Sequence, residues 1–175
     1  MGRVSPRSWD RGQSSIPATV VRASWFNQNF SEGAFADMVK AGHITLPAGG
    51  VREPFVDADD IAEVALAALT EDGHAGQIHE VTGPRALTFA EIAAEFSKAL
   101  ALEITYTQVP HEAFVAGAKD SGAPQDVVWM LDYLFATVLD GRNDQTTDGV
   151  ERALGRKPKD FADYAREAAA RGAWS

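Results

Sequence analysis

Residues Arg52–Pro84, which read REPFVDADDIAEVALAALTEDGHAGQIHEVTGP, contain the clearest succession of secondary-structure signals in the chain. Pro54–Val56 predicts a short buried strand, and Asp57 can cap a helix by accepting hydrogen bonds from its first free amides. The glycines within Gly73–Gly76 end that helix. Ile78–Val81 then alternates as a second strand. A strand, a capped helix and a strand in succession are typical of a βαβ-type unit in an α/β fold.

The helix inside this stretch is apolar on almost every side, so we expect it to be largely buried. One face carries Ile61, Val64, Ala65, Ala68 and Leu69. At the start of the helix, the acidic residues Asp57, Asp59 and Asp60 could bind a cation. Capping and a favourable interaction with the helix dipole are the preferred interpretation.

Four short motifs in this stretch carry a family resemblance. They are Phe55-Val56-Asp57, Asp60-Ile61-Ala62, Gly73-His74-Ala75-Gly76 and Thr82-Gly83-Pro84. In this order they resemble the NmrA-like branch of the atypical short-chain dehydrogenases. The resemblance extends from about Ser15 to Trp174 and corresponds to the later half of that fold. It implies an α/β fold with a partial Rossmann-type sheet of about 4–5 short, mostly parallel strands and a helical C-terminal part.

Composition limits the classes of partner. The chain has 175 residues, enough for one sizeable core, and a formal net charge of −9. That charge argues against nucleic acid and against an anionic membrane surface as partners. The absence of cysteine excludes disulfides and thiol chemistry and fits a cytoplasmic protein. Residues 1–14 lack any pattern and are interpreted as a disordered or foreign lead, and 15–175 as a single domain.

The remaining chain predicts further short strands and several helices. We expect strands at 18–21, 44–47 and 104–109, and helices at about 31–40, 89–100, 110–118, 126–139, 148–154 and 160–171. The helix at 89–100 opens with a Thr88-x-x-Glu91 capping box.

The segment that follows the first strand is the best local candidate for a ligand site. It reads RASWFNQNF from Arg22 to Phe30 and combines aromatic rings with side-chain amides. Ligands of open α/β sheets bind beyond the carboxyl ends of the strands. The competing interpretation is that the aromatic residues belong to the core and that the amides cap the following helix.

Familiar catalytic and cofactor motifs are missing from the sequence. No G-x-G-x-x-G turn or P-loop is present, and neither is a nucleophile elbow around Ser24. None of Tyr106, Tyr133 and Tyr164 has a lysine four residues later, so the Tyr-x-x-x-Lys pair of standard short-chain dehydrogenases is absent. The spacing of the histidines makes a metal site improbable, and His74 is expected to fix a loop. The catalytic residues therefore stay unknown.

The family resemblance suggests roles for the candidate segment. It implies that Ser24, Trp25 and Phe26 border the nicotinamide of NADP or NAD, and that Phe26, Asn29 and Phe55 line the cleft for a small-molecule substrate. The family contains NAD(P)H-dependent oxidoreductases and non-catalytic regulators that bind a dinucleotide. We therefore expect the substrate-side portion of an oxidoreductase that does not act alone, a regulatory or small-molecule-binding module, or an inactive fragment.

The missing glycine-rich turn and missing strands leave the strand at Thr19–Val21 with an unpaired apolar edge. We expect a second copy of the chain, or a complementary N-terminal half, to cover that edge.

Overall fold

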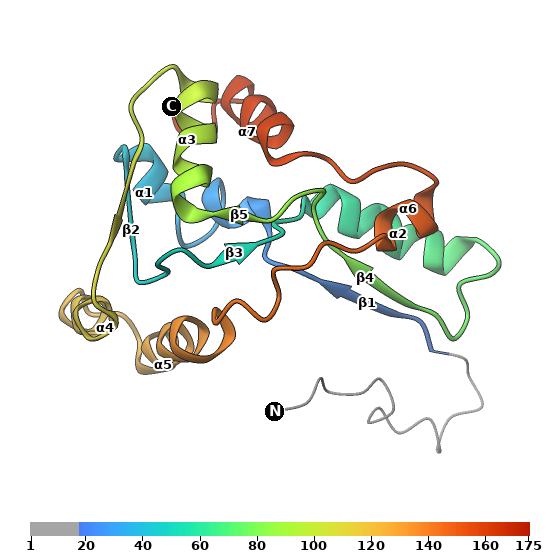
Figure 1. Ribbon diagram of the computed structural model, residues 1–175, viewed down its shortest axis with the longest axis horizontal. Coiled ribbons are helices and arrows are strands. Elements are labelled where there is room, and N and C mark those ends of the chain that lie inside the picture. Colours follow the sequence, from blue (N-terminus) through green and yellow to red (C-terminus); the bar gives the residue numbers. More distant parts are fainter. Residues whose placement is uncertain (1–17) are drawn as a thin grey trace.

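The computed structural model describes residues 18–175, in which short strands and helices alternate (Figure 1). The predicted N-terminal lead lies outside the described residues, and the division into a lead and one domain stays a prediction. The strands are β1 (Val20–Ala23), β2 (His43–Leu46), β3 (Arg52–Glu53), β4 (Ile78–Val81), β5 (Leu87–Thr88) and β6 (Thr105–Gln108). The helical segments are η2 (Asn27–Phe30), α1 (Ala36–Lys40), α2 (Ala58–Thr70), α3 (Phe89–Leu100), α4 (His111–Asp120), α5 (Gln125–Tyr133), η3 (Leu134–Val138), α6 (Gly149–Leu154) and α7 (Phe161–Ala170).

The strands form pairs. β1 pairs with β4 and β2 with β6, both in parallel, whereas β3 and β5 pair antiparallel. Val20 of β1 lies opposite Ile78 of β4, and Ala23 lies opposite Val81. Short parallel pairs with covering helices confirm the predicted α/β class and the partial Rossmann-like arrangement. The predicted strand at 54–56 is replaced by β3 and by a single parallel bridge between Phe26 and Val56.

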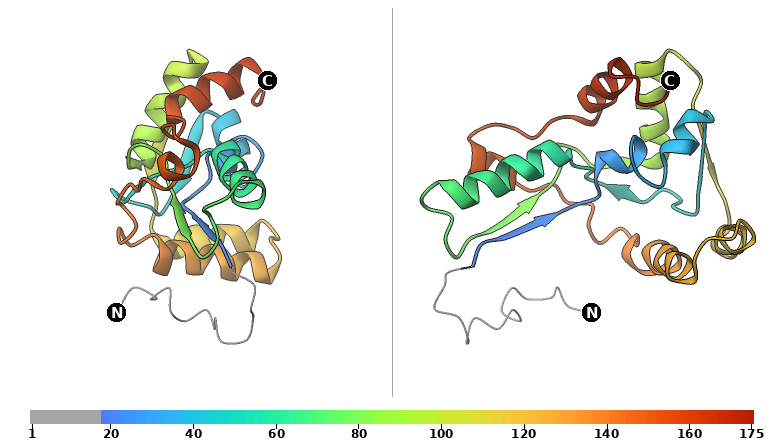
Figure 2. Two further views of the ribbon diagram at one scale, coloured as in Figure 1. Left: turned by 90° about the vertical axis from the view of Figure 1, so that its right-hand side faces the viewer. Right: turned by 180° about the vertical axis from the view of Figure 1, so that it is seen from behind.

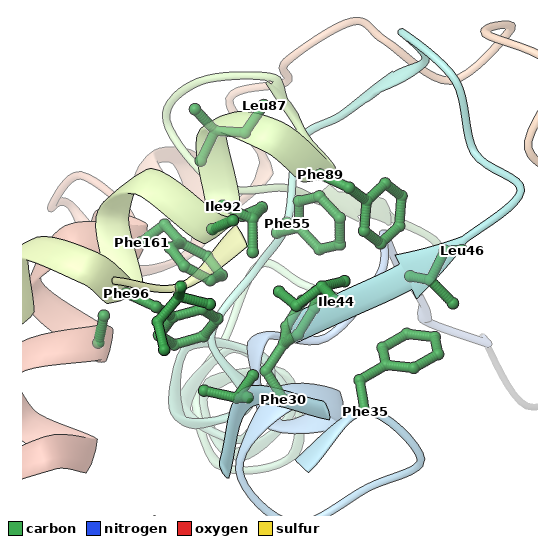
Figure 3. Packing of buried hydrophobic residues seen from close by; sticks show 14 of the residues in the cluster. Phe30, Phe35, Ile44, Leu46, Phe55, Leu87, Phe89, Ile92, Phe96 and Phe161 are labelled. Atoms are coloured by element: carbon green, nitrogen blue, oxygen red, sulfur yellow. The ribbon is translucent and has the colours of Figure 1, made fainter. Parts of the chain in front are cut away.

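A large aromatic core connects the helices of the C-terminal part to the strand ends (Figure 3). Phe30 lies at its centre, with ring centroids 5.7 Å from Phe55, 5.5 Å from Phe96 and 5.9 Å from Phe161. Such edge-on and tilted contacts are the favoured geometries of aromatic pairs. A smaller cluster lies between α2, β4 and α6 and consists of Val56, Val64, Val81 and Val150.

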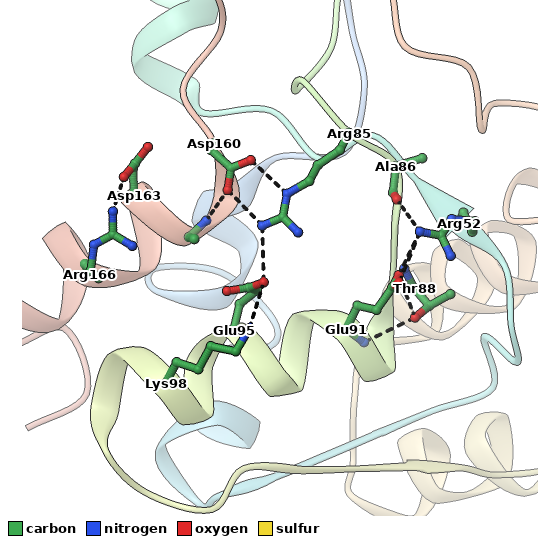
Figure 4. Close-up of polar contacts among 11 residues, drawn as sticks. Arg52, Arg85, Ala86, Thr88, Glu91, Glu95, Lys98, Asp160, Asp163 and Arg166 are labelled. Atoms are coloured by element: carbon green, nitrogen blue, oxygen red, sulfur yellow. Dashed lines mark hydrogen bonds and ion pairs between the residues drawn. The ribbon is translucent and has the colours of Figure 1, made fainter.

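Two predicted caps fix the helices that border these clusters. The Oδ1 atom of Asp57 accepts the amide of Asp59 at 2.8 Å, and Thr88 and Glu91 form the expected capping box of α3. A third link joins α3 to α7 (Figure 4). There, the Arg85 guanidinium donates two hydrogen bonds to Asp160, each at 2.8 Å, and one to Glu95 at 3.2 Å. The hydrogen bonds from Arg85 lower the pKa of Asp160, which also caps α7.

The expectation that α2 is largely buried is wrong for this structure. Leu66 and Leu69 are 60% and 85% exposed, and the buried residues of the helix are Asp60, Val64 and Ala67. The buried face is centred on Val64, and part of the predicted face is left open. Described residues cover α2 on the sheet side and, through α6, on one flank.

The boundaries of two other helices differ from the predicted ones for local reasons. Residues 31–35 form turns because the amides of Glu32 and Gly33 both donate to the carbonyl of Gln28, so α1 starts only at Ala36. The helix expected at 126–139 ends at Tyr133 and continues as the π-helical turn η3, which places Phe135 in the core. Figure 2 shows α4 and α5 side by side at the end of the molecule away from α2.

Candidate functional site

Three chain segments meet beyond the carboxyl ends of β1 and β4. The amide of Ser24 donates to the carbonyl of Val81 at 3.0 Å. Val56 then runs beside the continuing chain, donating to Trp25 at 2.9 Å and accepting from Asn27 at 2.8 Å. This junction is the place where open α/β folds bind ligands, and it contains the segment singled out from the sequence.

The Thr82-Gly83-Pro84 turn closes one side of the junction. The amide of Gly83 donates to the carbonyl of Pro54 at 3.0 Å. A Cβ atom at Gly83 would lie 2.0 Å from the carbonyl oxygen of Phe55, so no other residue fits without moving the backbone. The glycine of this motif therefore has a packing role, in which it brings the end of β4 against the segment after β3.

The structure separates the aromatic residues of the candidate segment. Phe26 is 43% exposed at the surface of the junction, whereas Phe30 and Phe55 are almost completely buried in the aromatic core. Trp25 is half-buried and lies 6.3 Å from Phe35 and 6.1 Å from Phe135 between ring centroids. Phe26 is therefore the ring of this group with the most surface open to a ligand. Phe55 is buried in the aromatic core next to the junction. That Phe26 and Phe55 line a substrate cleft stays a prediction.

The amides of this segment do not cap the helix that follows them. Instead, Gln28 caps α2: its Oε1 accepts the amide of Ala58 at 2.9 Å, and its Nε2 donates to Asp57 at 3.0 Å. Asn29, the other predicted substrate residue, is half-buried, and its carbonyl accepts the amide of Phe35 at 3.0 Å. A long-range cap of this kind depends on the fold bringing Gln28 to α2, so a local pattern could not indicate it.

Two buried polar side chains at the junction have no hydrogen-bond partner within residues 18–175. They are the hydroxyl of Ser24 and the side-chain amide of Asn27, whose residue is fully buried. A buried polar group without a partner costs about 1–3 kcal/mol. Sequence reasoning selected Ser24 but missed Asn27, because nothing distinguishes Asn27 from the neighbouring amides until burial is known.

Glu53 is a second functional candidate that the sequence did not indicate. It ends β3, is fully buried, and has no partner for either carboxylate oxygen among the described residues. Burial, with smaller contributions from the charges of Asp140 and Asp144, raises the pKa of Glu53 to about 7. A carboxyl group that titrates near neutral pH is able to give or take a proton. Here, however, its side chain does not reach the surface.

The acidic residues at the start of α2 are held by cations of the chain. Asp60 accepts Nη1 of Arg156 at 2.6 Å and the amide of Lys159 at 2.8 Å, and the Lys159 ammonium lies 3.3 Å from Asp57. A surface hollow of about 460 Å³ beside them is lined by these same mutually paired charges. Between residues 18 and 175, no group of three or more His, Asp or Glu side chains is arranged to hold a metal ion. The predicted capping role of Asp57 is confirmed by the hydrogen bond that its side chain accepts from the amide of Asp59.

His74 of the loop before β4 forms a buried pair with His79 of β4. Nδ1 of His74 lies 3.0 Å from Nε2 of His79, and the carbonyl of His74 accepts the hydroxyl of Thr19 at 2.7 Å. Burial, then His74 and Arg152, lower the pKa of His79. The predicted loop-fixing role of His74 is confirmed, because its contacts join the loop to β4 and to the residue before β1.

The fold and the junction together define the chain as a partial Rossmann-like α/β protein. The sequence profile of the NmrA-like family matches residues 12–165, so the chain belongs to the NmrA-like family. An NAD(P)H azoreductase of Xenophilus azovorans is 34% identical over 158 residues, which cover 90% of this chain and 55% of that protein. The chain thus spans about half the length of the relatives it matches.

Solved structures give the same picture of the fold. The NADPH complex of an Escherichia coli NADPH-dependent quinone oxidoreductase has a TM-score of 0.73 at 23% identity, covering 83% of this chain and 51% of that one. Nmra, a negative transcriptional regulator solved with NAD, has a TM-score of 0.56 at 21% identity, covering 91% and 56%. No helix between residues 18 and 175 is long and apolar enough to cross a membrane.

Proposed function

We propose that this chain is the substrate-side portion of an NAD(P)H-dependent oxidoreductase that acts on a small molecule. Ser24, Trp25 and Phe26 would border the nicotinamide of NADP or NAD, and Phe26, Asn29 and Phe55 would line or support the substrate cleft. The observation that carries the proposal is the junction itself. It combines an exposed aromatic ring with unpartnered polar side chains at the carboxyl end of β1, in a chain of the NmrA-like family.

The residues present fit one end of such a cofactor. A bound NAD(P)H would supply a hydride to the substrate. Phe26 offers an exposed ring against which a planar group can pack, whereas the polar atoms of Ser24 and Asn27 are buried beneath the surface of the junction. The sequence offers no binding site for the phosphates of the cofactor, because it lacks the glycine-rich turn whose amides would bind them. We therefore propose that a second polypeptide completes the cofactor site. A complementary half would supply the turn, whereas another copy of this chain lacks the turn as well and would only cover the edge of β1.

A titration with reduced nicotinamide tests this proposal. NADPH and NADH are added to the purified chain while nicotinamide fluorescence is followed. Saturable binding with a Kd in the micromolar range, about −8 kcal/mol, is expected only when the completing partner is present. Phe26→Ala should weaken this binding, and Leu102→Ala, at another exposed apolar position, is the matched control. Absence of binding by the completed assembly at millimolar cofactor would refute the oxidoreductase assignment.

The second candidate function is a regulatory module that binds a dinucleotide or small molecule without turning it over. The fold similarity to Nmra, a negative transcriptional regulator solved with NAD, supports this alternative. The two functions differ in turnover: an oxidoreductase consumes NAD(P)H when a quinone or azo acceptor is added, whereas a regulator only binds it. A cytoplasmic location is proposed for either, supported by the absence of cysteine.

A further inference from the structure

Among the described residues, three carboxylates are buried, and Glu53 differs from the other two. Asp57 caps α2 and lies 3.3 Å from the Lys159 ammonium, and Asp60 accepts hydrogen bonds from Arg156 and from the amide of Lys159. Neither oxygen of Glu53 has a hydrogen-bond partner between residues 18 and 175, although the side chain has no exposed surface. Burial without a partner favours the neutral carboxyl group, which is a hydrogen-bond donor.

The charged groups around Glu53 do not supply a counter-ion. Successive side chains of a strand point to opposite faces, and the guanidinium of the preceding Arg52 lies 3.0 Å from Glu91 instead. The charges of the chain that act on Glu53 from another segment are those of Asp140 and Asp144, which are both negative. Together with burial, which contributes most, they raise the pKa of Glu53 to about 7.

Glu53 borders the turn that closes the junction. It immediately precedes Pro54, whose carbonyl accepts the amide of Gly83 at 3.0 Å. The same turn follows Val81, whose carbonyl accepts the amide of Ser24 at 3.0 Å. Glu53 and Ser24 therefore border one short segment of main chain, at the carboxyl ends of β1 and β4. The buried carboxyl belongs to the place where the ligand is proposed to bind.

The loop between η3 and α6 is attached to the same turn. The amide of Thr147 donates to the hydroxyl of Thr82 at 2.9 Å, which fixes the end of the loop. Earlier in the loop, Arg142 pairs with Asp140, and within the described chain no side-chain hydrogen bond links residues 140–146 to another element. This part of the loop can therefore shift without breaking such links.

We propose that Glu53 is the proton donor of the proposed oxidoreductase: its neutral carboxyl donates a hydrogen bond to an oxygen of a planar carbonyl or quinone acceptor and gives up that proton when the acceptor is reduced. The acceptor reaches the carboxyl when residues 140–146 lift, and its plane packs against the exposed ring of Phe26. The inference rests on the proposed function, since it names the acid that the absent Tyr-x-x-x-Lys pair would otherwise supply.

The step balances for a quinone. A reduced nicotinamide supplies a hydride to one carbonyl oxygen of the quinone. The electron pair that is displaced through the ring collects on the opposite oxygen, which takes the proton of Glu53. The O–H bond of the carboxyl breaks and an O–H bond of the hydroquinone forms, and Glu53, now a carboxylate, recovers a proton from water. A carboxyl group that titrates near neutral pH is able to do both.

Binding of a quinone to this chain tests the hydrogen bond without any cofactor. The probe is tetramethyl-1,4-benzoquinone, and quenching of tryptophan fluorescence follows its binding. We expect saturable binding at pH 6 that weakens at least tenfold at pH 8.5, because ionised Glu53 no longer donates. Glu53→Gln keeps a donor that cannot ionise, so its binding should be equal at both pH values, and Glu53→Ala should bind weakly at both. Glu112→Gln, exposed on α4, should keep the pH dependence of the parent.

A loop variant adds a readout that a merely structural role would not move. Asp144→Asn removes one of the negative charges that raise the pKa of Glu53. The pH at which quinone binding is half lost should therefore shift downward in this variant, while binding at pH 6 stays close to that of the parent.

Turnover separates the role of Glu53 from the proposed function. In the assembly that binds NADPH, Glu53→Gln should slow quinone-dependent NADPH oxidation at least a hundredfold and leave NADPH binding unchanged. A folded chain that binds no quinone, binding that is independent of pH, or a Glu53→Gln variant that turns over at the parental rate would overturn the role of Glu53. A Glu53→Ala variant that does not fold leaves Glu53→Gln as the deciding one. Failure of every assembly to bind NADPH would refute the oxidoreductase and with it the proton transfer, whereas the pH dependence of quinone binding would still establish the hydrogen bond.

Discussion

The aromatic core and the valine cluster differ in how completely this chain encloses them. The aromatic core is surrounded by helices and strands from Phe30 to Trp174, and its central rings have no exposed surface. The valine cluster is backed by α6 on one side only, and on the other side it ends at half-buried Val21, Ala23 and Ile61. The central side chains of both clusters are buried, but the aromatic core is much larger and draws on more elements of the chain than the valine cluster does.

The largest difference between the two regions should be found in stability. Phe30→Ala, at the centre of the aromatic core, is expected to lower the free energy of unfolding by about 3–5 kcal/mol. Val64 is equally buried, but Val64→Ala removes a smaller side chain from a smaller cluster and should cost about 2 kcal/mol. Urea denaturation of both variants measures the gap. Equal losses would contradict the distinction between the larger and the smaller cluster.

Glu53 gives the aromatic side of the molecule a pH dependence. Its folded pKa of about 7 lies above the ordinary 4.5, so the folded state favours the protonated form. The stability associated with the neutral carboxyl is complete below pH 4.5 and is lost as the pH rises to about 7. Glu53→Gln should therefore be more stable than the parent above pH 7 by up to about 3 kcal/mol.

The prediction for Glu53 is tested by measuring the thermal unfolding of Glu53→Gln and of the parent at several pH values. The advantage of Glu53→Gln over the parent should vanish near pH 4 and grow up to pH 7. Glu112→Gln, at an exposed position of α4, serves as the matched control and should show no such trend. An advantage of Glu53→Gln that is independent of pH would mean that ionisation of Glu53 is not its source.

Hydrogen bonds from Arg85 join α3 to the start of α7, and both helices pack against the aromatic core. Arg85→Ala removes the bonds to Asp160 and Glu95 that join α3 and α7. The arginine is 40% exposed, so solvent weakens these contacts, and the expected loss is about 1 kcal/mol. Arg166→Ala, which removes a more exposed pair within α7, should cost less. Denaturant midpoints of the two variants decide the order.

The smallest effect on stability is expected at the open flank of α2. Leu69→Lys changes a side chain that is 85% exposed, so the free energy of unfolding of the isolated chain should change by less than about 0.5 kcal/mol. A substantial loss would show that Leu69 is already covered in solution. That result would remove the contrast between the two regions, and it can be measured by the same denaturation series.

Local signals in the sequence predicted much of the fold. The capping box of α3, the Asp57 cap of α2 and the alternation of β4 were all placed correctly, because each depends on residues within a few positions of one another. Boundaries failed where distant contacts intervened. The turns after Phe30 and the π-helical end of α5 are set by backbone hydrogen bonds and core packing that no short pattern displays.

The candidate site was only partly predictable. The sequence indicated the segment from Ser24 to Asn29, because aromatic and amide residues follow a strand. It did not indicate Asn27 or Glu53, whose interest comes from complete burial without a partner. Nor did it indicate that Gln28 caps a helix some thirty positions further along the chain. Burial and long-range capping are properties of the assembled chain.

The sequence by itself determined the α/β class, the family, the main helices and the segment that is proposed to meet a ligand. Those features rest on periodicity, caps and glycine turns, which act over a few residues. The tertiary structure alone decided which apolar surfaces are covered. Val64 and Leu69 are both apolar residues of α2, but Val64 is buried and Leu69 is 85% exposed. The reason is physical: burial depends on what packs against each face of a helix, and the described chain covers the Val64 face of α2 but leaves the Leu69 face open.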